Sequence, residues 1–137
     1  ADYLYNRQDY PAARRAYEKV IERYPNGEEA TQARRLLVEL ADLEADLVYQ
    51  AAMASFDLED HEQAALLLQA VVERYPGTVS AMAARCNLGV AYEHLGKWQA
   101  ADAVYGEVIK MAGNDEAFTD MIGFARDHQS WIREYRL

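Results

Sequence analysis

The four residues E-R-Y-P occur twice in this chain of 137 residues, at positions 22–25 and 73–76. Proline cannot extend the helix behind it, and it moves the preceding residue away from helical geometry. Each copy therefore predicts the end of one helix and a turn into the next. We expect Tyr24 and Tyr75 to pack against the helix that follows.

A repeat precedes each of these endings. Residues 10–25 align with residues 61–76 and with residues 98–113, where a glycine replaces the last proline. In each copy a small residue is followed four positions later by a bulky one and three later by valine, so that all three share a helical face. The small residue lets a partner helix approach closely. The three sets are Ala13, Tyr17 and Val20; Ala64, Leu68 and Val71; and Ala101, Tyr105 and Val108.

The composition favours helices and a protein partner. The chain has 51% hydrophobic residues, 7 glycines and 3 prolines, which suits long helices and predicts an all-α fold. Its net charge of −9 opposes binding to the phosphates of nucleic acid. Between Arg35 and Arg74 there is no Lys or Arg, whereas nine acidic residues occur there. That stretch should attract basic surfaces.

Residues 88–108, L-G-V-A-Y-E-H-L-G-K-W-Q-A-A-D-A-V-Y-G-E-V, resemble the signature of the tetratricopeptide repeat (TPR) family. Gly89 is the small contact residue of the first helix, and Gly96 is predicted to end that helix. The resemblance implies a right-handed α-solenoid of antiparallel helix pairs. Its concave face would be lined by the first helix of each pair.

The repeats are unevenly spaced, because Ala64 and Ala101 are 37 residues apart but Ala13 and Ala64 are 51 apart. The excess of 14 predicts one lengthened helix over residues 28–58, and a break near residues 42–46 is the alternative. We interpret residues 1–25 as a partial repeat, 28–76 and 78–113 as two further repeats and 114–137 as a capping helix with Asn114 as its N-cap. The long helix should present an apolar side that contains Leu36, Leu40, Leu43, Leu47, Ala51, Ala54 and Leu58.

Residues 10–96 also resemble the BamD-type outer-membrane assembly lipoproteins and related Y-P-rich periplasmic TPR proteins. In the BamD type a lengthened helix separates two helices that end in Y-P. This resemblance implies a parent protein at the periplasmic face of the outer membrane that scaffolds envelope assembly; otherwise we expect a cytoplasmic one. Since Ala1 falls within the first helix of a repeat, a further segment is expected to precede it.

No pattern for catalysis, a metal or a cofactor stands out, so we predict a non-enzymatic protein without any of them. The histidines His61, His94 and His128 are far apart in sequence, and neither a nucleophile motif nor a phosphate loop is present. Cys86 is the single cysteine, which excludes an intrachain disulfide, and it is interpreted as a packed small residue.

The TPR resemblance places the function on the concave face. Carboxylates around aromatic rings there would suit a partner peptide or helix with basic and apolar residues. In a competing interpretation Tyr49 and Phe56 pack on neighbouring helices while the acids face water. A further alternative is a homo-oligomer that forms through the long helix or the N-terminal edge. The predicted partner-binding residues are Asp42, Asp46, Tyr49, Met53, Phe56, Asp57, Val90, Glu93 and His94, with Asp2 and Tyr5 at the equivalent face of the partial repeat.

Overall fold

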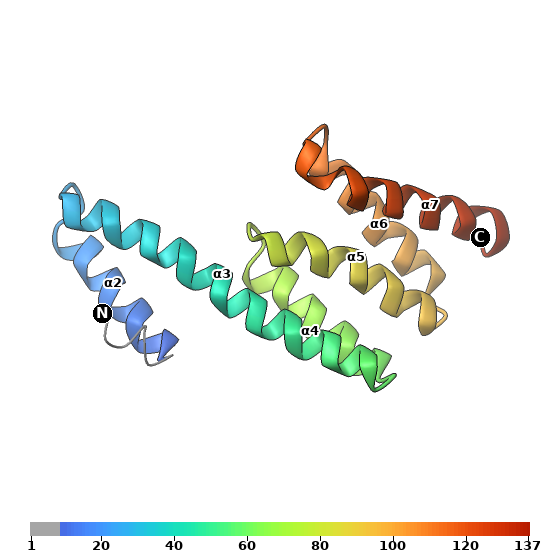
Figure 1. The fold of residues 1–137 in the computed structure, drawn as a ribbon, viewed down its shortest axis with the longest axis horizontal. Helices are drawn as coiled ribbons and strands as arrows, with labels where there is room; N and C mark the ends of the chain where they lie inside the picture. Colours follow the sequence, from blue (N-terminus) through green and yellow to red (C-terminus); the bar gives the residue numbers. More distant parts are fainter. Residues whose placement is uncertain (1–8) are drawn as a thin grey trace. The chain divides into compact units, whose positions relative to one another are not determined.

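The computed structural model describes residues 9–137, in which helices are joined by short turns (Figure 1). The all-α prediction is confirmed, because the described residues contain no strand. The helices are α2 (Tyr10–Arg23), α3 (Glu28–Asp57), α4 (His61–Arg74), α5 (Val79–His94), α6 (Trp98–Ala112), the 3₁₀ helix η1 (Glu116–Phe118) and α7 (Thr119–Tyr135). The predicted groove positions Asp2 and Tyr5 lie outside the described residues.

Both Y-P motifs end a helix, as predicted. Tyr24 and Tyr75 are the C-caps of α2 and α4, and their backbone N–H groups donate to the carbonyls of Val20 and Val71. The prediction that both rings pack inward is wrong for Tyr24, whose side chain is 57% exposed. Tyr75 packs against the core, as expected.

The residue after each Y-P turn differs in the two copies. Thr78 donates its hydroxyl to the Tyr75 carbonyl (2.8 Å) and accepts the Ala81 N–H, so that it caps α5 and holds the turn against that helix. At the corresponding place after Tyr24 stands Gly27, which has no side chain to make these bonds. The first copy therefore lacks the side-chain cap that the second copy has at this turn.

Two other helix ends test the sequence interpretation. Gly96 follows the C-cap Leu95 and has φ +72°, a conformation that glycine adopts without strain, so the predicted end of α5 is confirmed. Asn114 is not an N-cap. Asp115 takes this role instead, because its carboxylate accepts the Ala117 N–H (2.9 Å) at the start of η1.

Helix α3 is one helix of 30 residues, without a break near residues 42–46. Its predicted apolar side is only partly buried. Leu40 is buried, but Leu43, Leu47 and Leu58 are 38%, 51% and 81% exposed. The residues that α3 buries in its C-terminal half are Ala45 and Ala52, with Val48, Tyr49 and Phe56 half-buried beside them. The prediction of one continuous buried face along α3 is wrong, because the two halves of the helix pack against different neighbours.

The chain divides into two compact units, residues 1–44 and 45–137. In the first unit the described core consists of Ala13 and Tyr17 of α2 packed with Ala33 and Leu40 of α3. Arg14 forms an ion pair with Glu44. The two units are defined by contacts within each unit, and the predicted boundaries of the repeats stay a prediction.

In the second unit, α4 packs on α5, α5 on α6 and α6 on α7. The connections are short, which makes consecutive helices antiparallel. One core cluster joins the C-terminal half of α3 to α4 and α5, and a second joins α5 to α6 and α7. The second cluster contains the Gly89 contact expected from the repeat signature. A Cβ atom at Gly89 would lie 2.5 Å from ring atoms of Tyr105, so that only glycine permits this approach.

Arg85 is a charged side chain inside this unit, with only 5% of its surface exposed. Its Nε atom is buried without a hydrogen-bond partner, and its guanidinium has no ion pair among residues 9–137. A buried charge without a partner costs free energy, so replacement by an apolar side chain of similar length should not destabilise the fold.

We therefore expect Arg85→Met to leave the free energy of unfolding unchanged or to raise it by about 1 kcal/mol. Urea unfolding of the two proteins measures the difference. A loss of more than about 2 kcal/mol would contradict this assignment and would indicate that the guanidinium makes stabilising contacts.

Candidate functional site

A groove runs between α5 and α7 in the second unit, and its first pocket has a volume of about 310 Å³. Its lining is mostly apolar, with Ala83 and Cys86 from α5 and Met121 and Phe124 from α7. Polar groups from three helices complete it, namely Tyr49 of α3, Asn87 of α5 and Asp120 of α7. A mostly apolar cleft with a few polar groups is the usual form of a binding site.

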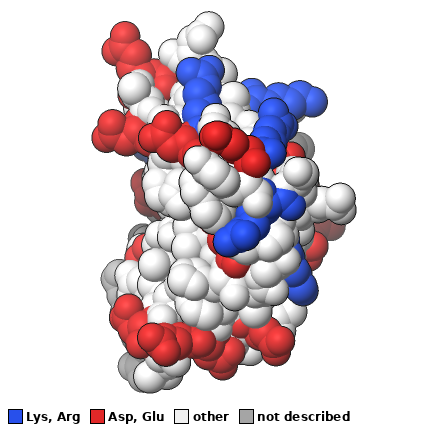
Figure 2. Space-filling view, turned by 90° about the vertical axis from the view of Figure 1, so that its right-hand side faces the viewer, with Lys and Arg blue, Asp and Glu red and all other residues white. Residues whose placement is uncertain are grey.

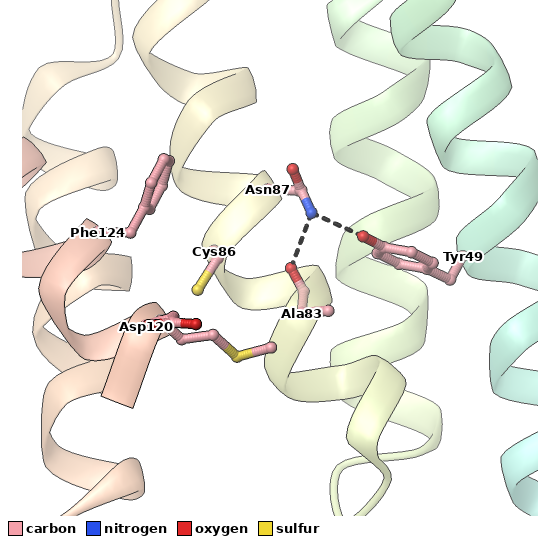
Figure 3. A pocket seen from close by; sticks show the side chains of 7 residues that line it. Tyr49, Ala83, Cys86, Asn87, Asp120 and Phe124 are labelled. Carbon is pink, nitrogen blue, oxygen red and sulfur yellow. Dashed lines mark hydrogen bonds between the residues drawn. The ribbon is translucent and has the colours of Figure 1, made fainter. Parts of the chain in front are cut away.

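Two adjacent residues of α5 face opposite sides of this pocket (Figure 3). Cys86 points toward α7, whereas Asn87 points toward α3, since neighbouring residues on a helix are about 100° apart. The Asn87 side-chain amide donates to the Tyr49 hydroxyl (2.8 Å) and to the Ala83 carbonyl (3.1 Å). Asn87 therefore holds the Tyr49 ring at the wall of the pocket.

Burial determines the protonation of the two titratable groups here. It raises the pKa of the Cys86 thiol and, as the largest cause, the pKa of the Tyr49 phenol. Both groups are therefore neutral near pH 7. A neutral, buried thiol is a poor nucleophile, which supports the packing interpretation of Cys86.

A second pocket of about 330 Å³ lies further along the same two helices. Glu93 near the C-terminal end of α5 forms one wall, and Asp127, His128 and Trp131 of α7 form the other. No Lys or Arg is among the described residues that line either pocket. The described walls of the groove therefore present carboxylates, aromatic rings and one histidine, and neither Lys nor Arg.

Three side chains from three helices meet at this second pocket: Glu93 and His128 of its lining and Tyr105 of α6. The Glu93 carboxylate accepts a hydrogen bond from the Tyr105 hydroxyl, and its Oε2 atom lies 2.6 Å from His128 Nδ1. Tyr105 is fully buried, and the His128 ring stacks on Phe124 with ring centres 4.0 Å apart. This network ties α7 to α5 and α6, so it positions the groove wall that carries Asp127 and Trp131.

Tyr105 should make the stability of the second unit depend on pH. Burial, followed by the hydrogen bond to Glu93, raises the pKa of its phenol well above the ordinary value near 10. The folded state thus keeps a proton that the unfolded chain loses above about pH 10, so stability is full below that pH and falls as the pH rises further.

We expect the free energy of unfolding to fall between about pH 10 and pH 11, with a slope of at most about 1.4 kcal/mol per pH unit from this group. Tyr105→Phe should remove this contribution. A smaller slope should remain, because burial also raises the pKa values of Tyr49 and Cys86. Urea unfolding at several pH values measures both. Equal slopes in the two proteins would exclude Tyr105 as the source.

The structure separates the predicted site residues into three groups. Tyr49 and Glu93 line the pockets. Met53, Phe56 and Val90 are half-buried outside them, and Phe56 packs against the core as the competing interpretation expected. Asp42, Asp46, Asp57 and His94 are exposed, and Asp42 belongs to the first unit.

Two of the histidines that are far apart in sequence lie close together in space. The rings of His61 and His94 stack with centres 4.1 Å apart, and Phe56 meets His61 edge-on. The antiparallel turn between α4 and α5 brings them together, although 33 positions separate them in the sequence. His94 is thus engaged with the start of α4 and lies outside both pockets.

Sequence reasoning missed the contribution of α7. The wall residues Asp120, Phe124, Asp127 and Trp131 follow each other at steps of four, three and four, which is the spacing of one helical face. That periodicity is present in the sequence. It is obscured by the apolar side of the predicted cap, to which the sequence assigned Trp131 together with Phe118, Met121, Ile122, Ala125 and Ile132.

Two kinds of site are absent from the described part of the chain. Over residues 9–137, no cluster of three His, Cys, Asp or Glu side chains is arranged to hold a metal ion. None of the helices in the same range is both long and apolar enough to span a membrane.

Comparison with known families agrees with the architecture. Tetratricopeptide repeat profiles match residues 49–116 and residues 1–27. The chain therefore belongs to the tetratricopeptide repeat family, which confirms the resemblance found in residues 88–108. Repeats of this family generally mediate protein–protein interaction and act as non-catalytic scaffolds. No curated protein sequence matches the chain.

Proposed function

We propose that the groove between α5 and α7 binds a segment of a partner protein that carries Lys or Arg beside apolar side chains. The observation that carries this proposal is the pairing of an apolar floor with an acidic rim. The floor is formed by Cys86, Met121 and Phe124, and the rim by Asp120 and Asp127.

The floor supplies area that a partner side chain can cover. Phe124 is 38% exposed although its ring stacks on His128, and Trp131 in the second pocket is 43% exposed although its ring contacts Trp98 and Tyr135. Large aromatic side chains at the centre of an interface contribute much of the binding free energy. An apolar anchor of the partner would therefore displace water from surface that the fold leaves open.

The rim supplies the charge preference. Asp120 and Asp127 are exposed and form no hydrogen bond or ion pair through their carboxylates with another described residue. In the view of Figure 2, acidic side chains gather near the bottom, and side chains of both signs occur near the top. Carboxylates beside an apolar floor attract a basic segment and repel an acidic one.

Peptide binding tests the proposal. We would titrate two sets of short fluorescent peptides that share their apolar residues but carry either Lys or Glu at the remaining positions, and follow anisotropy. The Lys set should bind, with an affinity that falls as salt rises, and the Glu set should not. Equal binding of both sets, or binding of neither, would overturn the proposal.

A charge-matched pair of double variants locates the binding. Asp120→Asn with Asp127→Asn should weaken the Lys peptides about tenfold, since each rim charge contributes up to about 1 kcal/mol. The control is Glu62→Gln with Glu107→Gln. Glu62 stands in the first turn of α4 as Asp120 does in α7, Glu107 is within α6, and neither lines the groove. The control should change affinity less than about twofold.

Self-association is a second candidate function, favoured by the exposed side of α3. Leu47 and Leu58 are 51% and 81% exposed, and Ala51 and Ala54 between them are exposed as well. Leu47, Ala51 and Ala54 follow the spacing of one face of α3, and Leu58 comes directly after the last residue of that helix. Light scattering at rising concentration should then show a dimer that Leu47→Gln with Leu58→Gln abolishes. A monomer at high concentration would remove this candidate.

The BamD-type resemblance leads us to propose, in addition, that the parent protein works at the periplasmic face of the outer membrane. The support is the lengthened helix between two helices that end in Y-P. Cell fractionation of the parent protein tests this location. Recovery in the cytoplasm would contradict it.

A further inference from the structure

We infer that the second pocket of the groove, formed by Glu93, Asp127, His128 and Trp131, is the subsite for a Lys or Arg side chain of the partner. This inference rests on the proposed function and names the chemistry at one position of the same site. It assigns the apolar anchor to the first pocket and the cation to the second.

The carboxylate that can receive a cation in this pocket is Asp127. Glu93 already accepts from Tyr105 and lies 2.6 Å from His128 Nδ1, so its charge is used within the fold. Asp127 has no hydrogen bond or ion pair through its carboxylate to another residue in the range 9–137, and it is exposed. An ammonium or guanidinium that enters the pocket would therefore meet a carboxylate that is free to pair.

The His128 ring forms part of the pocket wall, and its Nδ1 atom lies 2.6 Å from the Glu93 carboxylate. The ring is held in place by its stack on Phe124. Its orientation is thus set before a ligand arrives.

Trp131 supplies an aromatic surface that attracts cations. The chain's own Arg136 shows this property, because its guanidinium carbon lies 5.2 Å from the Trp131 ring centre and 5.0 Å from that of Trp98. Arg133, two positions after Trp131, is paired with Asp102 (2.8 Å). Neither arginine lines the pocket, so the carboxylate of Asp127 remains open to a partner.

The distance between the pockets sets a spacing in the partner. Cys86 and Glu93 are seven residues apart on α5, which is roughly 10 Å along the helix axis. An extended peptide covers roughly this distance in three residues. The partner should therefore carry its cation about three positions from its apolar anchor when it binds as an extended chain.

A double-mutant cycle between protein and peptide tests the assignment. From the Lys peptides that bind, each lysine is replaced in turn by norleucine, which keeps the length and removes the charge. One of these replacements should weaken binding to the unaltered chain about tenfold but weaken binding to Asp127→Asn less than about twofold. In the control variant Glu107→Gln the same peptide change should keep its full effect.

The outcomes separate this inference from the proposed function. In one outcome, Lys peptides bind and lose affinity for the double variant Asp120→Asn, Asp127→Asn, but no lysine replacement loses its effect in Asp127→Asn. The groove is then the binding site, and the assignment of the cation to the second pocket is wrong. If the peptides do not bind, both are overturned. The indole N–H signal of Trp131 in NMR spectra gives a second readout, since it should shift with the lysine peptide and not with its norleucine form.

Discussion

Gly89→Ala is expected to lower the free energy of unfolding of residues 45–137 by about 3 kcal/mol. The added methyl carbon would lie 2.5 Å from the Cε1 and Cζ atoms of Tyr105, well inside van der Waals contact. Tyr105 is fully buried and hydrogen-bonded to Glu93, so its ring cannot move aside without breaking other contacts. The helices α5 and α6 would have to separate.

Urea unfolding followed by tryptophan fluorescence measures this loss, because both tryptophans, Trp98 and Trp131, lie in the second unit. Gly123→Ala is the matched control. Gly123 is also inside a helix, but a Cβ atom added there would have no neighbouring atom within 4 Å. The better helix propensity of alanine should therefore raise stability by about 0.5–1 kcal/mol. Similar results for the two variants would show that the close approach at Gly89 carries no cost.

Tyr105→Ala should produce the larger effect, a loss of about 4 kcal/mol. Tyr105 is the largest of the fully buried side chains in the described chain, and it lies in the core cluster that joins α5, α6 and α7. Its removal leaves a cavity and takes a donor from Glu93. Tyr105→Phe keeps the ring and should cost only about 1–2 kcal/mol, which is the contribution of the hydroxyl and its hydrogen bond.

Combining the two changes tests whether Gly89 and Tyr105 act on each other. In the Tyr105→Ala background there is no ring for the new methyl group to meet, so Gly89→Ala should cost less than about 0.5 kcal/mol there. Urea unfolding of the four proteins completes the cycle. An additive result would mean that the cost at Gly89 arises from something other than contact with this ring.

Local patterns predicted much of the fold. Proline and glycine ended helices at Tyr24, Tyr75 and Gly96, because these residues restrict or permit backbone angles whatever surrounds them. The repeated small and bulky positions predicted buried faces, and Ala13, Tyr17, Leu68 and Tyr105 are buried. The signature in residues 88–108 also identified the family, since it records the small and bulky positions through which the two helices of one repeat pack.

The site was less predictable, because it depends on which helix lies beside which. Tyr49 and Glu93 were expected on the concave face and line the pockets, but His94 stacks on His61 instead. The leucine pattern of α3 did not reveal that Leu47 and Leu58 would stay exposed. Periodicity shows that residues share a face, and it does not show which neighbour, if any, covers that face.

The sequence alone thus determined the helical class, the positions where helices end, the tetratricopeptide repeat and the excess of acids. These follow from backbone restrictions, short-range spacing and charge, which act along the chain. Only the tertiary structure decided that α7 supplies one wall of the groove, that Asn87 holds Tyr49, and that Glu93 meets Tyr105 and His128. These contacts join residues that are 12 to 38 positions apart. They arise from the packing of whole helices, which no local pattern contains.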